Sequence, residues 1–206
     1  MKVARIIFPV KVLGPGNRVG IWLSGCPHRC KGCSNPELWD SSAIQDISPE
    51  TVIEAAKKIS GNSTFGVTVT GGEPFAQCEE LCCLTNMIRE LTDDILVYTG
   101  YTLKQLKESG NNYILKILDN IAVIIDGKYI EEKNSVQPLV GSTNQKIHYL
   151  KPCFKSIYQE YIANMHGKSF IQNFAVNKSV ISVGIHSPNF NAEFDNRMKK
   201  HLYGRK

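Results

Sequence analysis

Three cysteines, Cys26, Cys30 and Cys33, lie within eight residues of one another near the start of the chain. Thiolates at this spacing can converge on one metal centre, and the glycines of the segment permit a tight backbone path. Structural zinc normally takes four protein ligands, whereas three cysteines suit a [4Fe–4S] cluster that leaves one iron open for a substrate or cofactor. We therefore predict one [4Fe–4S] cluster on these residues. Zinc, with His28 as a strained fourth ligand, is the alternative, and a chance grouping of thiols is a third interpretation.

The other four cysteines show no ligand-like spacing. Cys78 and Cys82 are one helical turn apart, Cys83 adjoins them, and Cys153 is distant in the sequence. We interpret them as buried thiols, which are common on helices. A second cluster formed by all four is the alternative.

The composition excludes several classes of protein. The chain has 206 residues, 42% hydrophobic and 21% charged, as expected of a soluble globular protein rather than a disordered one. Its net charge of +5 is local, because residues 197–206 carry five Lys and Arg and no acid, so residues 1–196 are neutral overall. We therefore expect no nucleic-acid partner, and we interpret the basic tail as a solvated terminus.

The N-terminal segment predicts neither export nor a membrane anchor. Leu23-Ser24-Gly25-Cys26 has the form of a lipoprotein cleavage box, but charged residues, Gly and Pro between positions 11 and 18 interrupt the apolar stretch that a signal needs. No apolar run approaches the ~20 residues of a membrane span. We expect a cytoplasmic protein whose cysteines stay reduced.

The hydrophobic pattern alternates between strands and helices. We predict helices over residues 49–60, 79–91 and 102–118, the last with a break at 110–112, and buried strands at Val19–Leu23, Gly66–Thr70, Ile95–Tyr98 and Ile121–Ile125. Repeated strand–helix units of this length favour an α/β fold with a parallel sheet and right-handed crossovers.

Each chemically suggestive segment follows one of these strands. The cysteine segment comes after the first, Gly71-Gly72-Glu73-Pro74 after the second, Tyr98-Thr99-Gly100-Tyr101 after the third, and Asp126-Gly127 after the fourth. Parallel α/β sheets and barrels build their sites at the carboxyl ends of the strands. We therefore expect these segments to meet in one site.

These motifs carry a family resemblance over about residues 5–150. The CxxxCxxC spacing, followed by Gly-Gly-Glu-Pro after the next strand, resembles the radical S-adenosylmethionine (SAM) superfamily. Shorter motifs resemble its activase branch, above all the activating enzymes of anaerobic ribonucleotide reductase; they include Gly14-Pro15-Gly16-x-Arg18, Gly25-Cys26-Pro27-His28, Gly32-Cys33-x-Asn35, Trp39 and Gly141-Ser142-Thr143-Asn144-Gln145.

The resemblance implies a fold and a chemistry. The fold would be a partial, open (β/α) barrel of the radical SAM type, with residues 1–150 as its core and residues 151–206 as a C-terminal extension. The methionine part of SAM would chelate the open iron, and reduction by a flavodoxin- or ferredoxin-type partner would cleave SAM to a 5′-deoxyadenosyl radical. In this branch the radical removes a hydrogen atom from a backbone glycine of a glycyl-radical enzyme.

The resemblance also implies contacts to SAM. Gly71 and Gly72 would let the backbone approach the ligand, and Glu73 would help to bind the methionyl ammonium. Other interpretations stay open, since Tyr98 could be strand-end packing, Asp126 could cap a turn, and Asn144 could lie in a polar surface loop. The expected SAM-contacting positions are Gly71, Gly72, Glu73, Pro74, Tyr98, Asp126 and Asn144.

Two features depart from the activase pattern. Leu13 stands where an acidic residue is expected, and residues 151–206 extend past the usual end of the family. Within the extension we predict a hairpin of residues 169–175 and 180–185 around 177–179. It is either an added edge element or a device that reshapes the substrate opening for another partner.

The leading functional hypothesis is therefore a SAM-cleaving enzyme that activates a glycyl-radical enzyme. A truncated barrel has a wide lateral mouth, because a closed one usually needs ~250 residues, and such a mouth suits a protein loop as substrate. Radical modification of another peptide or of a small molecule is the second hypothesis. A non-enzymatic iron–sulfur electron carrier is the third, and the Gly-Gly-Glu-Pro segment disfavours it because an electron carrier needs no ligand pocket.

Overall fold

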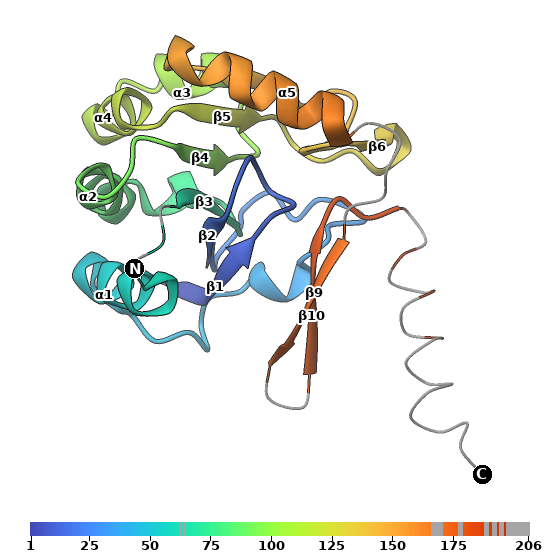
Figure 1. The fold of residues 1–206 in the computed structure, drawn as a ribbon, viewed down its shortest axis with the longest axis horizontal. Coiled ribbons are helices and arrows are strands. Elements are labelled where there is room, and N and C mark those ends of the chain that lie inside the picture. The colour runs from blue at the N-terminus through green and yellow to red at the C-terminus, as the bar shows by residue number, and fades with distance from the viewer. Residues whose placement is uncertain are drawn as a thin grey trace.

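Six strands form the central sheet of the computed structural model (Figure 1). The structure describes residues 1–61, 63, 65–165, 171–176, 179–187, 190, 193 and 196. The strand order is β1-β2-β3-β4-β5-β8. Strands β2 to β5 are mutually parallel, and the two edge strands pair antiparallel to their neighbours. The bounds are β1 Val3–Val10, β2 Arg18–Leu23, β3 Gly66–Gly71, β4 Ile95–Tyr98, β5 Val123–Asp126 and β8 Lys146–Tyr149.

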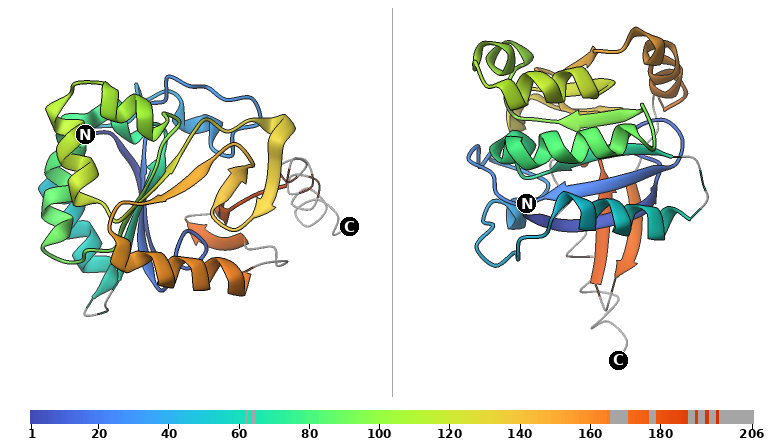
Figure 2. Two further views of the ribbon diagram at one scale, coloured as in Figure 1. Left: turned by 90° about the horizontal axis from the view of Figure 1, so that it is seen from above. Right: turned by 90° about the vertical axis from the view of Figure 1, so that its left-hand side faces the viewer.

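Four helices cover one face of this sheet, and later elements lie on the other (Figure 2). The first face carries α1 Pro49–Ser60, α2 Cys78–Arg89, α3 Leu103–Glu108 and α4 Asn112–Asn120. Alternate strand residues point to opposite faces, so Ile95 and Val97 pack beneath the helices while Leu96 packs on the far side. Both faces are therefore buried, which explains the continuous apolar runs of the central strands.

The helix boundaries follow from ordinary capping. The backbone N–H of Thr51 donates to the Ser48 side chain, which caps α1, and Pro49 occupies the first helical position. The predicted break at 110–112 is confirmed, because Gly110 adopts φ +67° and Asn111 caps α4 by accepting from the Tyr113 N–H. The sequence predictions of β2 to β5 and of the first two helices are likewise confirmed, within a few residues at their ends.

The sheet is open. Among the described residues its edge strands β1 and β8 do not pair with each other. The partial barrel of the radical SAM type therefore stays a prediction. No helix in the described part of the chain has both the length and the apolar character needed to cross a bilayer.

Buried Arg18 ties the start of β2 to β3 and to the segment before β4. Its Nη1 donates to the Asp94 carboxylate at 2.6 Å, its Nε donates to the Thr68 hydroxyl at 2.6 Å, and its Nη2 donates to the Val67 carbonyl at 2.7 Å. The Tyr158 hydroxyl donates to the same carboxylate at 2.7 Å. Arg18, which belongs to a motif of the family resemblance, is therefore part of the scaffold rather than of a surface site.

Several elements were not predicted from the sequence. They are the edge strands β1 and β8, the helix α5 Lys155–Met165, the small pair β6 Asn134–Gln137 and β7 Val140–Ser142, and the short 3₁₀ turns η1 Pro36–Leu38, η2 Pro74–Gln77, η3 Glu131–Lys133 and η4 Pro152–Phe154. Helix α5 buries only Tyr158 among its residues, so its apolar pattern is faint.

The C-terminal extension includes a hairpin of β9 Ile171–Val176 and β10 Ser179–Gly184. The two strands agree with the predicted hairpin where they are described; residues 169, 170, 177 and 178 lie outside the described residues, as does the basic tail 197–206. Val183 packs into a cluster with Ile7 and Val10 of β1. The division into a core of 1–150 and an extension of 151–206 stays a prediction.

Candidate functional site

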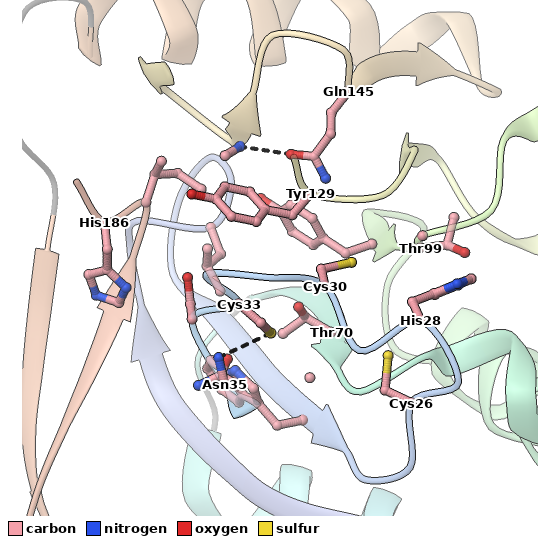
Figure 3. Close-up of a pocket in the computed structure, with 18 of the residues that line it drawn as sticks. Cys26, His28, Cys30, Cys33, Asn35, Thr70, Thr99, Tyr129, Gln145 and His186 are labelled. Carbon is pink, nitrogen blue, oxygen red and sulfur yellow. Dashed lines mark hydrogen bonds between the residues drawn. The ribbon is translucent and has the colours of Figure 1, made fainter. Parts of the chain in front are cut away.

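One cavity gathers residues from the carboxyl ends of the parallel strands and from the C-terminal hairpin (Figure 3). All three cysteines of the predicted cluster line it. The other residues that line it include Leu13, Trp22, His28, Thr70, Gly71, Tyr98, Thr99, Gly100, Gly127, Tyr129, Gly141, Gln145, Ser182, Val183, Gly184, Ile185 and His186. The expected meeting of the strand-end segments in one site is thus found for most of them.

The three cysteine side chains line the cavity and do not converge on one position. Cys26, Cys30 and Cys33 are each half-buried. Among the described residues, no group of three His, Cys, Asp or Glu side chains is arranged to hold a single metal ion. A [4Fe–4S] cluster attaches each cysteine to a different iron, so its ligands need not converge on one position. This donor set is therefore compatible with a cluster, whereas the described residues show no preformed site for a single zinc ion.

Burial raises the pKa of the Cys30 and Cys33 thiols, and the neighbouring cysteines raise it further. The neighbouring sulfurs thus disfavour negative charge on Cys30 and Cys33. Bound irons would reverse this preference, because a metal stabilises the thiolate that coordinates it.

The sulfur of Cys33 also has N–H groups beside it. The backbone N–H of Asn35 donates to Sγ at 3.4 Å. The indole N–H of Trp39 also contacts this sulfur and lowers the pKa of the thiol, although the contact falls short of full hydrogen-bond geometry. Donors to a ligating sulfur stabilise its negative charge and so tune a metal centre.

Backbone geometry holds the cysteine loop in place. Gly25 adopts φ +98° and Gly32 adopts φ +70°, which confirms that glycines are needed along this path. The N–H of Cys26 donates to the Trp39 carbonyl at 3.0 Å, and that of Gly25 donates to the Leu38 carbonyl at 2.8 Å. The start of the loop is therefore fixed by the residues that follow it.

Gly71 and Gly72 have a structural reason to be glycine. A Cβ on Gly71 would lie 2.4 Å from the Leu23 carbonyl oxygen, and one on Gly72 would lie 2.4 Å from the Gly25 carbonyl oxygen. The pair therefore lets β3 approach the start of the cysteine loop. Gly71 lines the cavity, but Gly72 does not, so their predicted approach to a ligand is not the only constraint on them.

Glu73 lies beside the cavity rather than in its lining. Its carboxylate is 1% exposed and is hydrogen-bonded to the Phe75 N–H, the Thr99 hydroxyl, the Gly100 N–H and His28 Nε2, at 2.8 to 3.0 Å. A carboxylate has about four acceptor positions, so the protein already uses them all. The predicted contact of Glu73 with an ammonium group stays a prediction, and in the structure its carboxylate joins the ends of neighbouring strands. Pro74 is buried beside it at the start of η2.

His28 is a site residue that the sequence did not single out as more than a zinc alternative. Its Nε2 lies 2.9 Å from the Glu73 carboxylate, and its ring packs edge-on against Tyr101 at 4.6 Å. A Cβ on Gly100 would lie 2.3 Å from the His28 ring. Gly100 therefore leaves room for His28, which joins the cysteine loop to the ends of β3 and β4.

The remaining expected positions divide between two cavities. Tyr98 lines the cysteine cavity; burial raises the pKa of its hydroxyl. Asp126 and Asn144 instead line a second, neighbouring cavity, which Lys104, Lys107, Lys128 and Lys146 also line.

The contacts of these two residues are with the protein. The Asp126 carboxylate accepts from the Leu103 N–H at the start of α3, at 2.6 Å, and lies 3.0 Å from His148 Nε2. Asn144 Nδ2 donates to the Lys128 carbonyl at 2.8 Å. The structure therefore does not place either residue with the cysteines, and their predicted contacts to SAM stay predictions.

From the motif of residues 141–145, it is Gly141 and Gln145 that reach the cysteine cavity. Gln145 accepts from the Gly141 N–H at 2.9 Å (Figure 3). It also donates to the Gly127 carbonyl at 2.9 Å. It thus joins two loops of the cavity wall. The motif itself was the available signal, but the sequence did not indicate which of its residues faces inward.

The other four cysteines lie elsewhere. Cys82 is buried, as predicted, and Cys78 is half-buried and accepts from the Asn111 side-chain amide at 3.3 Å. Cys83 and Cys153 are exposed, so the interpretation of all four as buried thiols is wrong for these two. Within the described residues none of the four belongs to a group that could hold a metal ion.

Comparisons with known proteins agree with the cysteine site. Residues 12–148 match the family model of the 4Fe-4S single cluster domain. The anaerobic ribonucleoside-triphosphate reductase-activating protein of Enterobacteria phage T4 is 34% identical over 140 residues, which are 66% of this chain and 86% of that protein. The chain belongs to this family of activating proteins.

Bacterial members of the family align over the same region. The activating protein of Vibrio cholerae serotype O1 is 34% identical over 151 residues, covering 68% of this chain and 94% of that protein. The one from Escherichia coli K12 is 30% identical over 152 residues, covering 70% of this chain and 96% of that protein. The family's length is thus nearly all matched, while close to a third of this chain lies outside each match.

Proposed function

We propose that this protein binds one [4Fe–4S] cluster on Cys26, Cys30 and Cys33, cleaves SAM, and thereby generates a glycyl radical on an anaerobic ribonucleoside-triphosphate reductase. The observation that carries the proposal is one cavity that is lined by these three of the seven cysteines and by the carboxyl ends of the parallel strands. The names of the relatives supply the partner. An open barrel of the radical SAM type is the fold that this chemistry would use.

When bound, the cluster supplies the electron that splits SAM into methionine and a 5′-deoxyadenosyl radical, and a flavodoxin- or ferredoxin-type protein would deliver that electron. The residues of the chain position and shield the reactants. Half-buried thiols would hold the cluster at the carboxyl ends of the strands, and the Glu73–His28 contact fixes the cysteine loop against β3 and β4. Tyr98 and Tyr129 provide ring surface in the same cavity.

Anaerobic reconstitution tests the proposal. We expect about four irons per chain and release of 5′-deoxyadenosine after addition of dithionite and SAM. The Cys26/Cys30/Cys33→Ala triple variant should lose both, whereas Cys83→Ala, which removes an exposed cysteine from α2, should keep both. No 5′-deoxyadenosine from the wild type above the triple variant would refute SAM cleavage.

The partner requires a separate measurement. Mixing the loaded protein with the anaerobic ribonucleoside-triphosphate reductase of the same organism should produce a glycyl radical signal in electron paramagnetic resonance. SAM cleavage without that signal would favour radical modification of another peptide or of a small molecule.

The iron content tests the alternative of a second cluster. A value near eight irons per chain, rather than about four, would favour a second cluster on Cys78, Cys82, Cys83 and Cys153.

A further inference from the structure

The C-terminal extension supplies a wall of the cysteine cavity. Residues 182–186, from the end of β10 and the segment after it, line the same cavity as the three cysteines. Figure 3 shows His186 on one side of this cavity and Cys26 and His28 on the other. The family match ends at residue 148, so this wall is formed by a part of the chain that the family region does not contain.

The hairpin is held against the sheet by specific contacts. The Gln172 side chain donates to the Pro9 carbonyl at 2.8 Å and accepts from the Lys11 N–H at 2.9 Å. Val183, 4% exposed, packs into the apolar cluster of β1 and β2. The Asn134 side chain donates to the His186 carbonyl at 3.2 Å. The position of the wall is therefore set by contacts with β1, β2 and β6.

His186 has hydrogen-bonding capacity that the described residues leave unused. Its Nε2 lies 3.2 Å from the Ser182 hydroxyl, and its ring stacks on Phe190 at 4.1 Å. Its Nδ1 is buried and has no hydrogen-bond partner among the described residues. Burial also lowers the pKa of His186, so the imidazole is neutral near pH 7 and offers one donor and one acceptor.

The cavity favours an uncharged ligand group at this wall. No Lys, Arg, Asp or Glu is among the described residues that line it. A phosphate or carboxylate at the hairpin side would find no cationic side chain, whereas a peptide amide is neutral and has both a donor and an acceptor. A buried Nδ1 without a partner costs free energy that such an amide would recover.

We propose that Ser182 and His186 bind the main chain of a peptide segment of the partner protein, placing it across the cavity from the cysteines. The inference rests on the proposed function, because it names the part of the reductase that enters this site. It gives the extension a role in substrate recognition that shorter members of the family must fill in another way.

The test compares binding of the full-length reductase to the reconstituted protein and its variants. His186→Phe keeps a ring to stack on Phe190 and removes both nitrogens, so we expect the Kd for the reductase to rise about fivefold. His186→Gln keeps a neutral donor and acceptor and should recover part of the affinity. Asn173→Ala, at an exposed position of β9 opposite Ser182, is the control and should bind like the wild type.

The outcomes separate this inference from the proposed function. Iron content and circular dichroism equal to the wild type establish that each variant is folded and loaded; if His186→Phe is not, Ser182→Ala takes its place. Equal Kd values for wild type and the folded variant overturn the inference, as does a wild type that does not bind the reductase. A wild type that binds the reductase but releases no 5′-deoxyadenosine refutes the proposed function, and the ratio of Kd values still decides the role of His186.

Discussion

At the scale of single residues, the N–H groups beside the Cys33 sulfur would influence the reduction potential of a bound cluster. Asn35 and Trp39 both present N–H groups to it. The first is a backbone group that follows from the turn, whereas the second belongs to a side chain that can be exchanged. A substitution of Trp39 therefore changes the surroundings of the cluster and leaves its three cysteine ligands intact.

Trp39→Phe should make the reduction potential of the cluster more negative. Removal of the indole N–H takes away a partner that favours negative charge on the ligating sulfur, so the reduced cluster loses more stability than the oxidised one. A redox titration followed by electron paramagnetic resonance measures the shift. Iron content should stay that of the wild type, and an unchanged potential in a fully loaded variant would show that the contact is only packing.

Glu73→Gln should lower the free energy of unfolding by about 2–3 kcal/mol. The amide replaces one acceptor oxygen by an NH₂ group that faces donors, either Phe75 and Thr99 or His28 and Gly100. Urea unfolding of the unloaded protein measures the loss. Glu54→Gln, on the exposed side of α1, should change stability by less than about 0.5 kcal/mol; equal effects of the two substitutions would mean that the Glu73 contacts contribute nothing special.

At the scale of elements, the buried pair of Arg18 and Asp94 joins the start of β2 to the segment before β4. Asp94→Asn should destabilise the fold by about 3–5 kcal/mol, because it leaves a fully buried guanidinium without its counter-charge. Asp93→Asn is a matched control, since Asp93 forms an exposed ion pair with Lys151 and should cost no more than about 1 kcal/mol. Thermal unfolding of both variants decides; similar melting temperatures would contradict the role of the buried pair.

The central elements could be predicted from the sequence and the peripheral ones could not, for a physical reason. Strands β2 to β5 are covered on both faces, so most of their residues are apolar and the strands can be recognised in the sequence. Strand β1 is an edge strand with mostly half-buried residues and an internal Arg5, and α5 buries only Tyr158. Such elements are stabilised by tertiary contacts that leave little pattern in the sequence.

The same distinction applies to the site. Motif spacing identified the three cysteines and the strand-end segments, because both depend on local sequence. It could not show that the Glu73 carboxylate is already saturated by the protein, or that Asp126 faces a second cavity. The contribution of residues 182–186 was equally out of reach, since it results from packing between segments more than 150 residues apart.

At the scale of the whole molecule, the hairpin closes one side of the site. Removal of the chain after residue 165 takes away the wall formed by residues 182–186. We expect the reconstituted cluster to bleach several-fold faster in air than in the full chain, which visible absorbance follows directly. The loss of Val183 from its apolar cluster should also lower the melting temperature. An equally long-lived cluster in a folded truncated protein would show that the wall does not limit access of oxygen.

The absence of charged side chains from the described lining of the cysteine cavity has a consequence for solution conditions. Interactions between neutral groups are hardly screened by dissolved ions, whereas those between exposed charges weaken over a Debye length of about 8 Å at physiological ionic strength. The insertion of a peptide segment at Ser182 and His186 should therefore be nearly indifferent to added salt. Any salt dependence of partner association must then come from the outer surface, where the lysines of the second cavity lie. Ionic strength thus separates the approach of the two proteins from the entry of the segment that reacts.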